Sequence, residues 1–238
     1  MMKLCSNINS NEVSFIQFHC LLNRAGRKSV IDAGLTKFPK VTVILRGYNY
    51  EQVRCVVKSM VGTKLGAIEV AMNTPGAAQI IEKVVKEFGD EVLVGAGTVI
   101  SATRANAAVE AGARFALSPI CFTEEIFSIC KANGLLTVPS AFSPSEVWNM
   151  FEMGADIVKV FPAGTLGPKY IKDIQAPLNP MPIMVVGGVN GDNCQEFFDE
   201  GASYAGIGSG IFDPKHIIEM DEDGLKADIE AFEGKVRW

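Results

Sequence analysis

Histidine is scarce in this 238-residue sequence, which contains only His19 and His216. The two lie far apart and neither has a carboxylate motif around it, so a histidine-based metal site is not expected. The six cysteines show no CxxC or other ligand-like spacing. Thiols scattered in this way are typical of reduced, mostly buried cysteines, which predicts a cytoplasmic protein without a bound metal.

Two further absences concern positive charge and long apolar segments. The formal net charge is −5, so the chain lacks the basic excess that attracts nucleic acid or anionic lipid. No stretch approaches the roughly 20 apolar residues that span a membrane. The apolar run Phe15–Leu22 is short and precedes no small-residue cleavage site, so we expect a helix there and no signal peptide. Neither nucleic acid nor a membrane is an expected partner.

The sequence does contain a regular alternation from residue 41 onward. Short β-branched runs alternate with longer amphipathic stretches, and Gly or Pro often marks the joins. Eight strands with intervening helices predict a (β/α)₈ TIM barrel, and a doubly wound open sheet is the competing architecture. The predicted strands are Val41–Arg46, Ala67–Met72, Val92–Gly95, Phe115–Leu117, Leu135–Val138, Asp156–Val160, Ile183–Val186 and Tyr204–Ile207. The predicted helices lie near residues 50–63, 76–88, 101–112, 123–133, 143–153, 168–176, 190–200 and 223–235.

Length and composition favour one barrel domain. Hydrophobic residues make up 48% of the chain, which is enough for a substantial core, and single α/β barrels often have this length. We assign residues 41–238 to the barrel and residues 1–40 to an N-terminal helical extension. Gly112, Gly154 and Gly201 each end a predicted helix and lead straight into a strand, as helix-terminating glycines do.

Lys159 is the strongest candidate for catalysis. In a closed barrel, catalytic groups lie at the C-terminal ends of the strands. The alternation of side chains directs Ile157, Lys159 and Phe161 towards the barrel axis. A lysine that loses solvation there has a lowered pKa, which favours the neutral, nucleophilic amine. The alternative is a lysine that reaches solvent or pairs with a carboxylate at the strand end.

Glu69 is also predicted to point inward, between the small residues Ala67 and Ala71. A buried carboxylate is costly unless it is paired or used. With Lys159 in the same interior, Glu69 would act as a general acid and base whose pKa is raised by burial. A structural ion pair between the two side chains is the alternative explanation.

Two polar residues are expected at the mouth of the barrel. Arg46 ends the first predicted strand, where its guanidinium suits a carboxylate or phosphate, although a salt bridge at the rim is equally compatible. Thr98 offers a hydroxyl donor at the end of the third strand. The segment 95–98 resembles the start of a dinucleotide fingerprint, but Ile100 stands where glycine is needed, so no nicotinamide cofactor is expected.

Two glycine clusters follow the last two predicted strands. Val186–Asn190 follows the seventh strand, and Gly206–Gly210 follows the eighth. Loops at these positions hold a phosphate in many barrels through backbone N–H groups, and glycine lets the backbone approach the ligand closely. Each cluster alone is compatible with a simple turn. Together they favour a phosphate site.

Taken in order, these segments resemble the bacterial 2-keto-3-deoxy-6-phosphogluconate/4-hydroxy-2-oxoglutarate aldolase family. The likeness spans about residues 40–212. Within the family it is closer to the 2-keto-3-deoxy-6-phosphogalactonate branch, because Met72–Pro75 and residues 161–172 resemble that branch. The matching segments are Leu45–Gly47, Ile68–Val70, Val94–Val99, Val158–Ala163, Val186–Val189 and Gly206–Ser209.

The resemblance implies a class I aldolase that splits a 2-keto-3-deoxy-6-phospho sugar acid into pyruvate and glyceraldehyde 3-phosphate without a metal or cofactor. It implies that Lys159 forms a Schiff base with the keto group and that Glu69 moves protons. It also implies a homotrimer, since members of the family generally form trimers. The implied substrate-binding residues are Arg46, Thr98, Pro119 and Phe161 for the keto-acid end, and Gly187, Gly188, Gly208 and Ser209 for the phosphate.

Three positions leave the substrate less defined than the reaction. Asn73 stands where the phosphogluconate branch has arginine, and Ile120 and Ser140 stand at strand ends where the family usually has smaller residues or asparagine. Two other functions also fit the barrel pattern. One is another phosphate-binding enzyme, such as an isomerase, epimerase or synthase, and the other is a non-catalytic barrel that binds a sugar phosphate. Only the aldolase needs Lys159 and Glu69 together inside the barrel.

Overall fold

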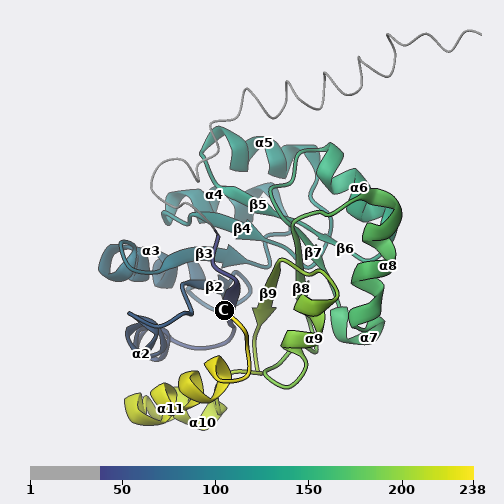
Figure 1. Cartoon of the computed structure of the whole chain (residues 1–238). Helices are drawn as coiled ribbons and strands as arrows, with labels where there is room; N and C mark the ends of the chain where they lie inside the picture. The colour runs from purple at the N-terminus through teal and green to yellow at the C-terminus, as the bar shows by residue number, and fades with distance from the viewer. Residues whose placement is uncertain (1–37) are drawn as a thin grey trace, which may run out of the picture. The chain divides into compact units, whose positions relative to one another are not determined.

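The computed structural model describes residues 38–238, and its parallel strands form one ring-shaped sheet (Figure 1). Along this sheet the strand order is β5-β4-β3-β2-β1-β9-β8-β7-β6. The strands are β1 (Val41–Leu45), β2 (Ala67–Ala71), β3 (Leu93–Gly97), β4 (Phe115–Leu117), β5 (Leu136–Val138), β6 (Ser140–Ala141), β7 (Val158–Val160), β8 (Ile183–Val186) and β9 (Tyr204–Ile207). Each predicted strand is present.

The two ends of this order, β5 and β6, are halves of one strand that is interrupted only by Pro139. Proline has no N–H to donate to the ladder, so regular pairing breaks at that residue. β5 pairs with β4 and β6 pairs with β7, while the Pro139 carbonyl accepts the N–H of Lys159 at 2.8 Å. The nine segments are therefore eight barrel strands, and the ring closes through the interrupted one. The predicted (β/α)₈ barrel is confirmed, and the doubly wound sheet is excluded.

Helices surround the strands on the outside of the ring (Figure 1). Polar residues start several of them, and Asn49 with Gln52 and Ser143 with Glu146 form reciprocal capping boxes. The short α7 and α10 were not predicted from the sequence. The helices are α2 (Tyr50–Met60), α3 (Ala77–Phe88), α4 (Ala102–Glu110), α5 (Glu124–Ala132), α6 (Pro144–Glu152), α7 (Ala163–Leu166), α8 (Pro168–Leu178), α9 (Cys194–Asp199), α10 (Pro214–Glu219) and α11 (Glu222–Glu233).

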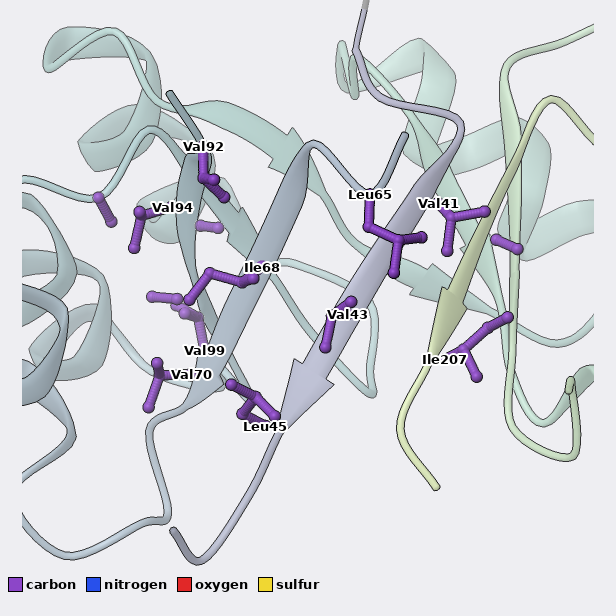
Figure 2. Close-up of a cluster of buried hydrophobic side chains, with 14 of the residues drawn as sticks. Val41, Val43, Leu45, Leu65, Ile68, Val70, Val92, Val94, Val99 and Ile207 are labelled. Carbon is purple, nitrogen blue, oxygen red and sulfur yellow. The ribbon is translucent and has the colours of Figure 1, made fainter. Parts of the chain in front are cut away.

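The main hydrophobic core lies between the strands and the helices. Large aliphatic side chains point outward from the strands into this layer, as Figure 2 shows for Ile68 and Val70 of β2. The alternate positions of β2 are Ala67, Glu69 and Ala71, which face the barrel axis. Small side chains there leave the interior open enough to take a few long polar ones, which is where the candidate site lies.

Glycine ends the helices that lead into strands, as predicted. Gly112, Gly154 and Gly201 have φ values of 78°, 91° and 99°, which lie in the left-handed region that favours glycine. Each follows the last turn of its helix and turns the chain back towards the sheet. These glycines lie at the end of the barrel opposite the carboxyl ends of the strands, so the prediction that they serve the fold is confirmed.

Two predictions concern residues that lie outside the described part of the chain. The N-terminal extension assigned to residues 1–40, and the helix expected at Phe15–Leu22, fall almost wholly before residue 38. Both stay predictions. Within residues 38–238, no helix combines the length and the apolar content that a membrane crossing requires.

Candidate active site

Lys159 lies in the middle of β7 and points towards the barrel axis. Its neighbours Val158 and Val160 belong to the outer hydrophobic layer, whereas the Lys159 side chain is 4% exposed inside the ring. Burial lowers the pKa of Lys159 to about 8; the negative charge of Glu69 opposes this shift, and the positive charge of Arg46 adds to it. The Lys159 Nζ atom lies 4.7 Å from the centroid of the Phe161 ring.

Glu69 projects from β2, which stands four strands away from β7 in the eight-strand ring and therefore on the opposite side of it. Its side chain is 1% exposed. Burial raises the pKa of Glu69 to about 7, although the positive charges of Lys159 and Arg46 act in the other direction. Among the described residues, its Oε2 atom has no hydrogen-bond partner. A buried carboxyl group without a hydrogen-bond partner is available to exchange a proton with a bound ligand.

No direct ion pair joins Lys159 to Glu69 within residues 38–238. Their charges influence each other, as the pKa shifts show, but the two groups reach inward from opposite walls. The alternative of a structural ion pair between them therefore finds no support in the geometry. The arrangement instead places an amine and a carboxyl group on two sides of a common interior.

Glycines on β3 make room for the inward side chains. A Cβ atom at Gly97 would collide with the carboxyl group of Glu69, and one at Gly95 would collide with the ring of Phe115. Both glycines occupy inward positions, because Ala96 between them belongs to the outer layer. The segment that resembled the start of a dinucleotide fingerprint is thus explained by packing inside the barrel.

Arg46 and Thr98 come together at the carboxyl ends of β1 and β3. The Arg46 Nη2 atom lies 3.5 Å from Thr98 Oγ1, a long contact between two exposed or half-buried groups. Thr98 has a φ of 57°, an uncommon conformation for a residue with a side chain. Arg104 on α4 donates from Nη1 to the Thr98 carbonyl at 2.9 Å, which holds the strained residue in place. A guanidinium and a hydroxyl at this end suit the carboxylate of a keto acid.

Phe161 connects Lys159 to the first glycine loop. Its half-buried ring lies beside Lys159 Nζ and packs so closely on Gly187 that a Cβ there would stand 2.9 Å from Phe161 Cε2. Gly187 and Gly188 have φ values of 87° and 74°, which glycine adopts without strain. The loop therefore needs glycine both for its backbone conformation and for contact with the aromatic ring.

The second glycine loop carries Gly208 and Ser209 and follows β9, next to β8 in the ring. Both residues are exposed. Within the described chain, Ser209 makes no hydrogen bond, so its hydroxyl is free to meet a ligand. The two loops follow the adjacent strands β8 and β9, and β8 in turn pairs with β7, which carries Lys159.

The residues that depart from the family pattern are Ile120, which lies just after β4, and Ser140, which is the first residue of β6. Ser140 pairs with Lys159 in the β6–β7 register and is buried, whereas its neighbour Ala141 belongs to the outer layer. Ser140 therefore faces the interior next to the lysine. Its N–H donates to the Ile120 carbonyl at 3.0 Å, and the Ile120 side chain is 51% exposed beside the half-buried Pro119.

Three polar residues around the site were not found from the sequence. Besides Arg104, they are Thr74, whose Oγ1 accepts the N–H of Gly47 at 2.9 Å next to Arg46, and Asn193, which binds the first glycine loop. Arg104 and Asn193 bind backbone atoms of the candidate residues Thr98 and Gly188, and Thr74 binds the backbone of Gly47 beside Arg46. Their only sequence signal was a position in a turn or near a helix start, which many residues without such a role share.

Comparisons with known proteins agree with this geometry. The sequence pattern of the KDPG and KHG aldolases matches residues 31–227. The 2-dehydro-3-deoxy-6-phosphogalactonate aldolase of Escherichia coli K12 is 29% identical over 203 residues, which cover 85% of this chain and 98% of that protein. A probable 2-dehydro-3-deoxy-6-phosphogalactonate aldolase of Rhizobium meliloti is 33% identical over 172 residues, 72% of this chain and 81% of that one.

Solved structures give the same result. A native KDPGal structure superposes with a TM-score of 0.72 at 28% identity, covering 84% of this chain and 96% of that chain. The KDPG aldolase of Legionella pneumophila, with pyruvate captured as a covalent carbinolamine, gives a TM-score of 0.74 at 26% identity and covers 84% and 95%. The family predicted from the sequence is thus confirmed: this chain belongs to the KDPG and KHG aldolases.

Proposed function

We propose that this chain is a class I aldolase that reversibly cleaves a 2-keto-3-deoxy-6-phospho sugar acid, the phosphogalactonate or the phosphogluconate, into pyruvate and glyceraldehyde 3-phosphate. The observation that carries the proposal is a buried amine and a buried carboxyl group on opposite strands of one barrel; burial lowers the pKa of Lys159 to about 8 and raises that of Glu69 to about 7. Shifts of this kind give a neutral amine and a protonated carboxyl group in the same pH range. The activity named for the relatives and the carbinolamine captured in the Legionella enzyme support the reaction class.

Imine formation is the first step in this proposal. The neutral amine of Lys159 adds to the C2 ketone, and Glu69 supplies the proton that lets the carbinolamine lose water. The resulting iminium withdraws electrons from the carbon chain. Burial of both side chains keeps bulk water away from this intermediate.

Carbon–carbon cleavage follows from the iminium. The carboxylate of Glu69, directly or through a water molecule, takes the proton of the C4 hydroxyl, the C3–C4 bond breaks, and its electron pair moves to the iminium nitrogen. Glyceraldehyde 3-phosphate leaves, and the three-carbon enamine takes a proton at C3. Hydrolysis of the new iminium then releases pyruvate and restores the amine. The electron sink is the protonated imine itself, so this route calls for no metal or cofactor.

The two ends of the substrate are assigned to two groups of residues at the barrel mouth. Arg46 and Thr98 lie together at the ends of β1 and β3, which suits the carboxylate. Pro119 and Phe161 would line the path to the amine, with Phe161 already in contact with Lys159. The glycine loops after β8 and β9 would hold the phosphate through Gly187, Gly188, Gly208 and Ser209, because the loops follow adjacent strands and both offer exposed backbone.

We also propose that the protein is a cytoplasmic homotrimer. Ile120, Phe142 and Trp148 are large apolar side chains with 51%, 48% and 44% of their surface exposed. Contacts between copies would cover apolar surface of this kind. Light scattering coupled to size-exclusion chromatography tests the assembly, and a mass of one chain or two would contradict it.

One experiment tests the chemistry most directly. The protein is incubated with pyruvate, reduced with borohydride and digested, and the modified peptide is mapped by mass spectrometry. We expect one adduct of pyruvate mass on Lys159 and none in Lys159→Met. An unmodified Lys159, or full aldol cleavage by Lys159→Met, would contradict the proposal. Assays of the two C4 epimers then identify the preferred substrate, and loss of activity on treatment with a chelator would contradict the metal-free mechanism.

A further inference from the structure

Asn193 has no part in the mechanism above, yet its side chain ties the glycine loop after β8 to the start of α9. Its Nδ2 atom donates to the carbonyl of Gly188 at 2.8 Å, and its Oδ1 atom accepts the N–H of Asn190 at 2.9 Å. One planar amide thereby bridges two peptide groups of the same loop. With both ends of the amide engaged, the direction of the Gly188 carbonyl is set by the side chain of Asn193.

The direction of a carbonyl also fixes the direction of the N–H in the same peptide group, because the two point to opposite sides of a trans peptide. The Gly187 carbonyl accepts the N–H of Gly164 at 2.7 Å, so the N–H of Gly188 points away from α7. The Gly188 carbonyl is held by Asn193, so the N–H of Val189 points away from α9. Within residues 38–238, neither of these N–H groups donates a hydrogen bond. Two successive N–H groups therefore remain without an acceptor among the described residues, one on the exposed Gly188 and one on the buried Val189.

The bridge of Asn193 also reaches the second glycine loop. A Cβ atom at Gly210 would stand 2.7 Å from Asn190 Cβ and 2.9 Å from the Val189 carbonyl oxygen. The loop that carries Gly208 and Ser209 is therefore packed on the turn that begins at Asn190. Since Asn193 holds that turn through the N–H of Asn190, it influences the spacing between the two glycine loops.

We propose that Asn193 is a positioning residue for the phosphate group of the substrate. Asn193 directs the N–H of Val189, next to that of Gly188, towards the phosphate oxygens. It also fixes the distance between the two glycine loops that bind the phosphate. Asn193 itself does not touch the substrate. This inference rests on the proposed function, because it requires a phosphorylated ligand at these loops.

Asn193→Ala and Asn193→Asp test the inference. Alanine removes both hydrogen bonds, whereas aspartate keeps the acceptor for Asn190 but cannot donate to Gly188 and adds a negative charge near the phosphate. Each variant is assayed with the phosphorylated 2-keto-3-deoxy acid and with the same acid lacking the phosphate. We expect the KM for the phosphorylated acid to rise about tenfold in Asn193→Ala, and further in Asn193→Asp. The reason is that the N–H groups of the loop would no longer point at the charged phosphate, so hydrogen bonds to it would weaken. The kcat/KM for the unphosphorylated acid and the borohydride trapping of pyruvate should stay unchanged.

Gln195→Ala is the matched control. Gln195 lies two residues further on α9 and binds Asp199 and the backbone of Arg237, away from the glycine loops. The Gln195→Ala substitution should leave the ratio of the KM values for the phosphorylated and unphosphorylated acids unchanged. It should affect the stability of α9 about as much as Asn193→Ala does. Thermal unfolding of all the variants, with and without inorganic phosphate, gives a second readout that does not depend on turnover. Phosphate should raise the Tm of the wild type and of Gln195→Ala more than that of Asn193→Ala.

The outcomes separate the inference from the function on which it rests. Equal losses for the two substrates in folded Asn193→Ala, or no loss for either, would overturn the positioning role while leaving the aldolase intact. If Asn193→Ala does not fold, Asn193→Asp decides by the same comparison. A wild type that treats both acids alike and gains no stability from phosphate would overturn the phosphate site, and with it this role of Asn193.

Discussion

The carboxyl group of Glu69 lies directly over the Cα atom of Gly97 on the neighbouring strand. In the β2–β3 register Glu69 is opposite Gly95, while Gly97 is opposite Ala71. The Glu69 side chain therefore leans along the strands towards the carboxyl end of the barrel, where Lys159 and the other candidate residues lie. The absence of a side chain at residue 97 is what allows this orientation.

Gly97→Ala should displace the Glu69 carboxyl group without changing any proposed catalytic residue. The added methyl group would occupy the space of the Glu69 carboxyl group. Neither can move aside easily, because Glu69 is buried and the strands are paired on both sides. We expect kcat/KM to fall about hundredfold, as for loss of a general acid or base, and the free energy of unfolding to fall by about 1–3 kcal/mol. Gly234→Ala, where a Cβ makes only ordinary contacts of 3.5 Å and longer, is the control and should keep full activity. Full activity in Gly97→Ala would show that the orientation of Glu69 does not matter.

The rate of imine formation with pyruvate should depend on pH with a maximum between about 7 and 8. Lys159, whose pKa is lowered to about 8, becomes nucleophilic as the pH rises, and Glu69, whose pKa is raised to about 7, loses its acidic proton over the same range. In Glu69→Gln the falling limb at high pH should vanish. The remaining rising limb then reports the pKa of Lys159 directly, and this pKa should lie below its wild-type value of about 8, because the charge of Glu69 raises the pKa of Lys159. Stopped-flow measurements of adduct formation provide the profile, and a Lys159 pKa of about 8 or higher in Glu69→Gln would rule out coupling between the two groups.

Arg104 should stabilise the left-handed conformation of Thr98. The left-handed backbone conformation destabilises a residue with a side chain by roughly 1–2 kcal/mol. The guanidinium of Arg104 donates a hydrogen bond of 2.9 Å to the carbonyl of Thr98, which adopts this conformation. We expect Arg104→Met to lower the free energy of unfolding by about 1 kcal/mol and to raise the KM for the keto acid several-fold. In a Thr98→Gly background the same change should cost less stability, because glycine adopts this φ without support. Equal costs in the two backgrounds, measured by urea unfolding, would contradict the role assigned to Arg104.

Ser140→Gly should alter substrate choice more than it alters the chemistry. The serine pairs with Lys159 and faces the interior, so its removal widens the space next to the amine. We expect the ratio of kcat/KM for the two C4 epimers to change by several-fold to about tenfold, as a small change in pocket contacts predicts. Borohydride trapping with pyruvate, which has no C4, should proceed as in the wild type. A change in trapping without a change in epimer ratio would assign Ser140 to the chemical step instead.

Much of the barrel was predictable because its strands carry a strict alternation. The bounds of β4, β8 and β9 agree residue for residue with those predicted, since each is a short apolar segment that follows a helix end. The inward direction of Lys159 and Glu69 followed from the same alternation. The division of the fifth strand at Pro139 did not, because both halves continue one extended path and only the missing N–H separates them.

The parts of the site that were not predictable depend on contacts between distant segments. Nothing in residues 101–104 indicates that Arg104 reaches back to the carbonyl of Thr98, and nothing in 190–193 indicates where the amide of Asn193 points. Such side chains bind main-chain atoms, and main-chain atoms are the same in every sequence. The pKa shifts also required the structure, because they depend on how completely the barrel buries each group.

The closure of the barrel at Pro139 has a consequence for how activity arises during folding. The carbonyl of Pro139 is the acceptor for the backbone of Lys159, so the last joint of the ring is also the anchor of the proposed nucleophile. In a chain whose joint is still open, β8 can pair with β7, but the backbone of Lys159 lacks its hydrogen bond to Pro139 on the other side. During refolding, the appearance of imine-forming activity should therefore report closure of the ring. Partly folded chains should form helix and sheet before they react with pyruvate.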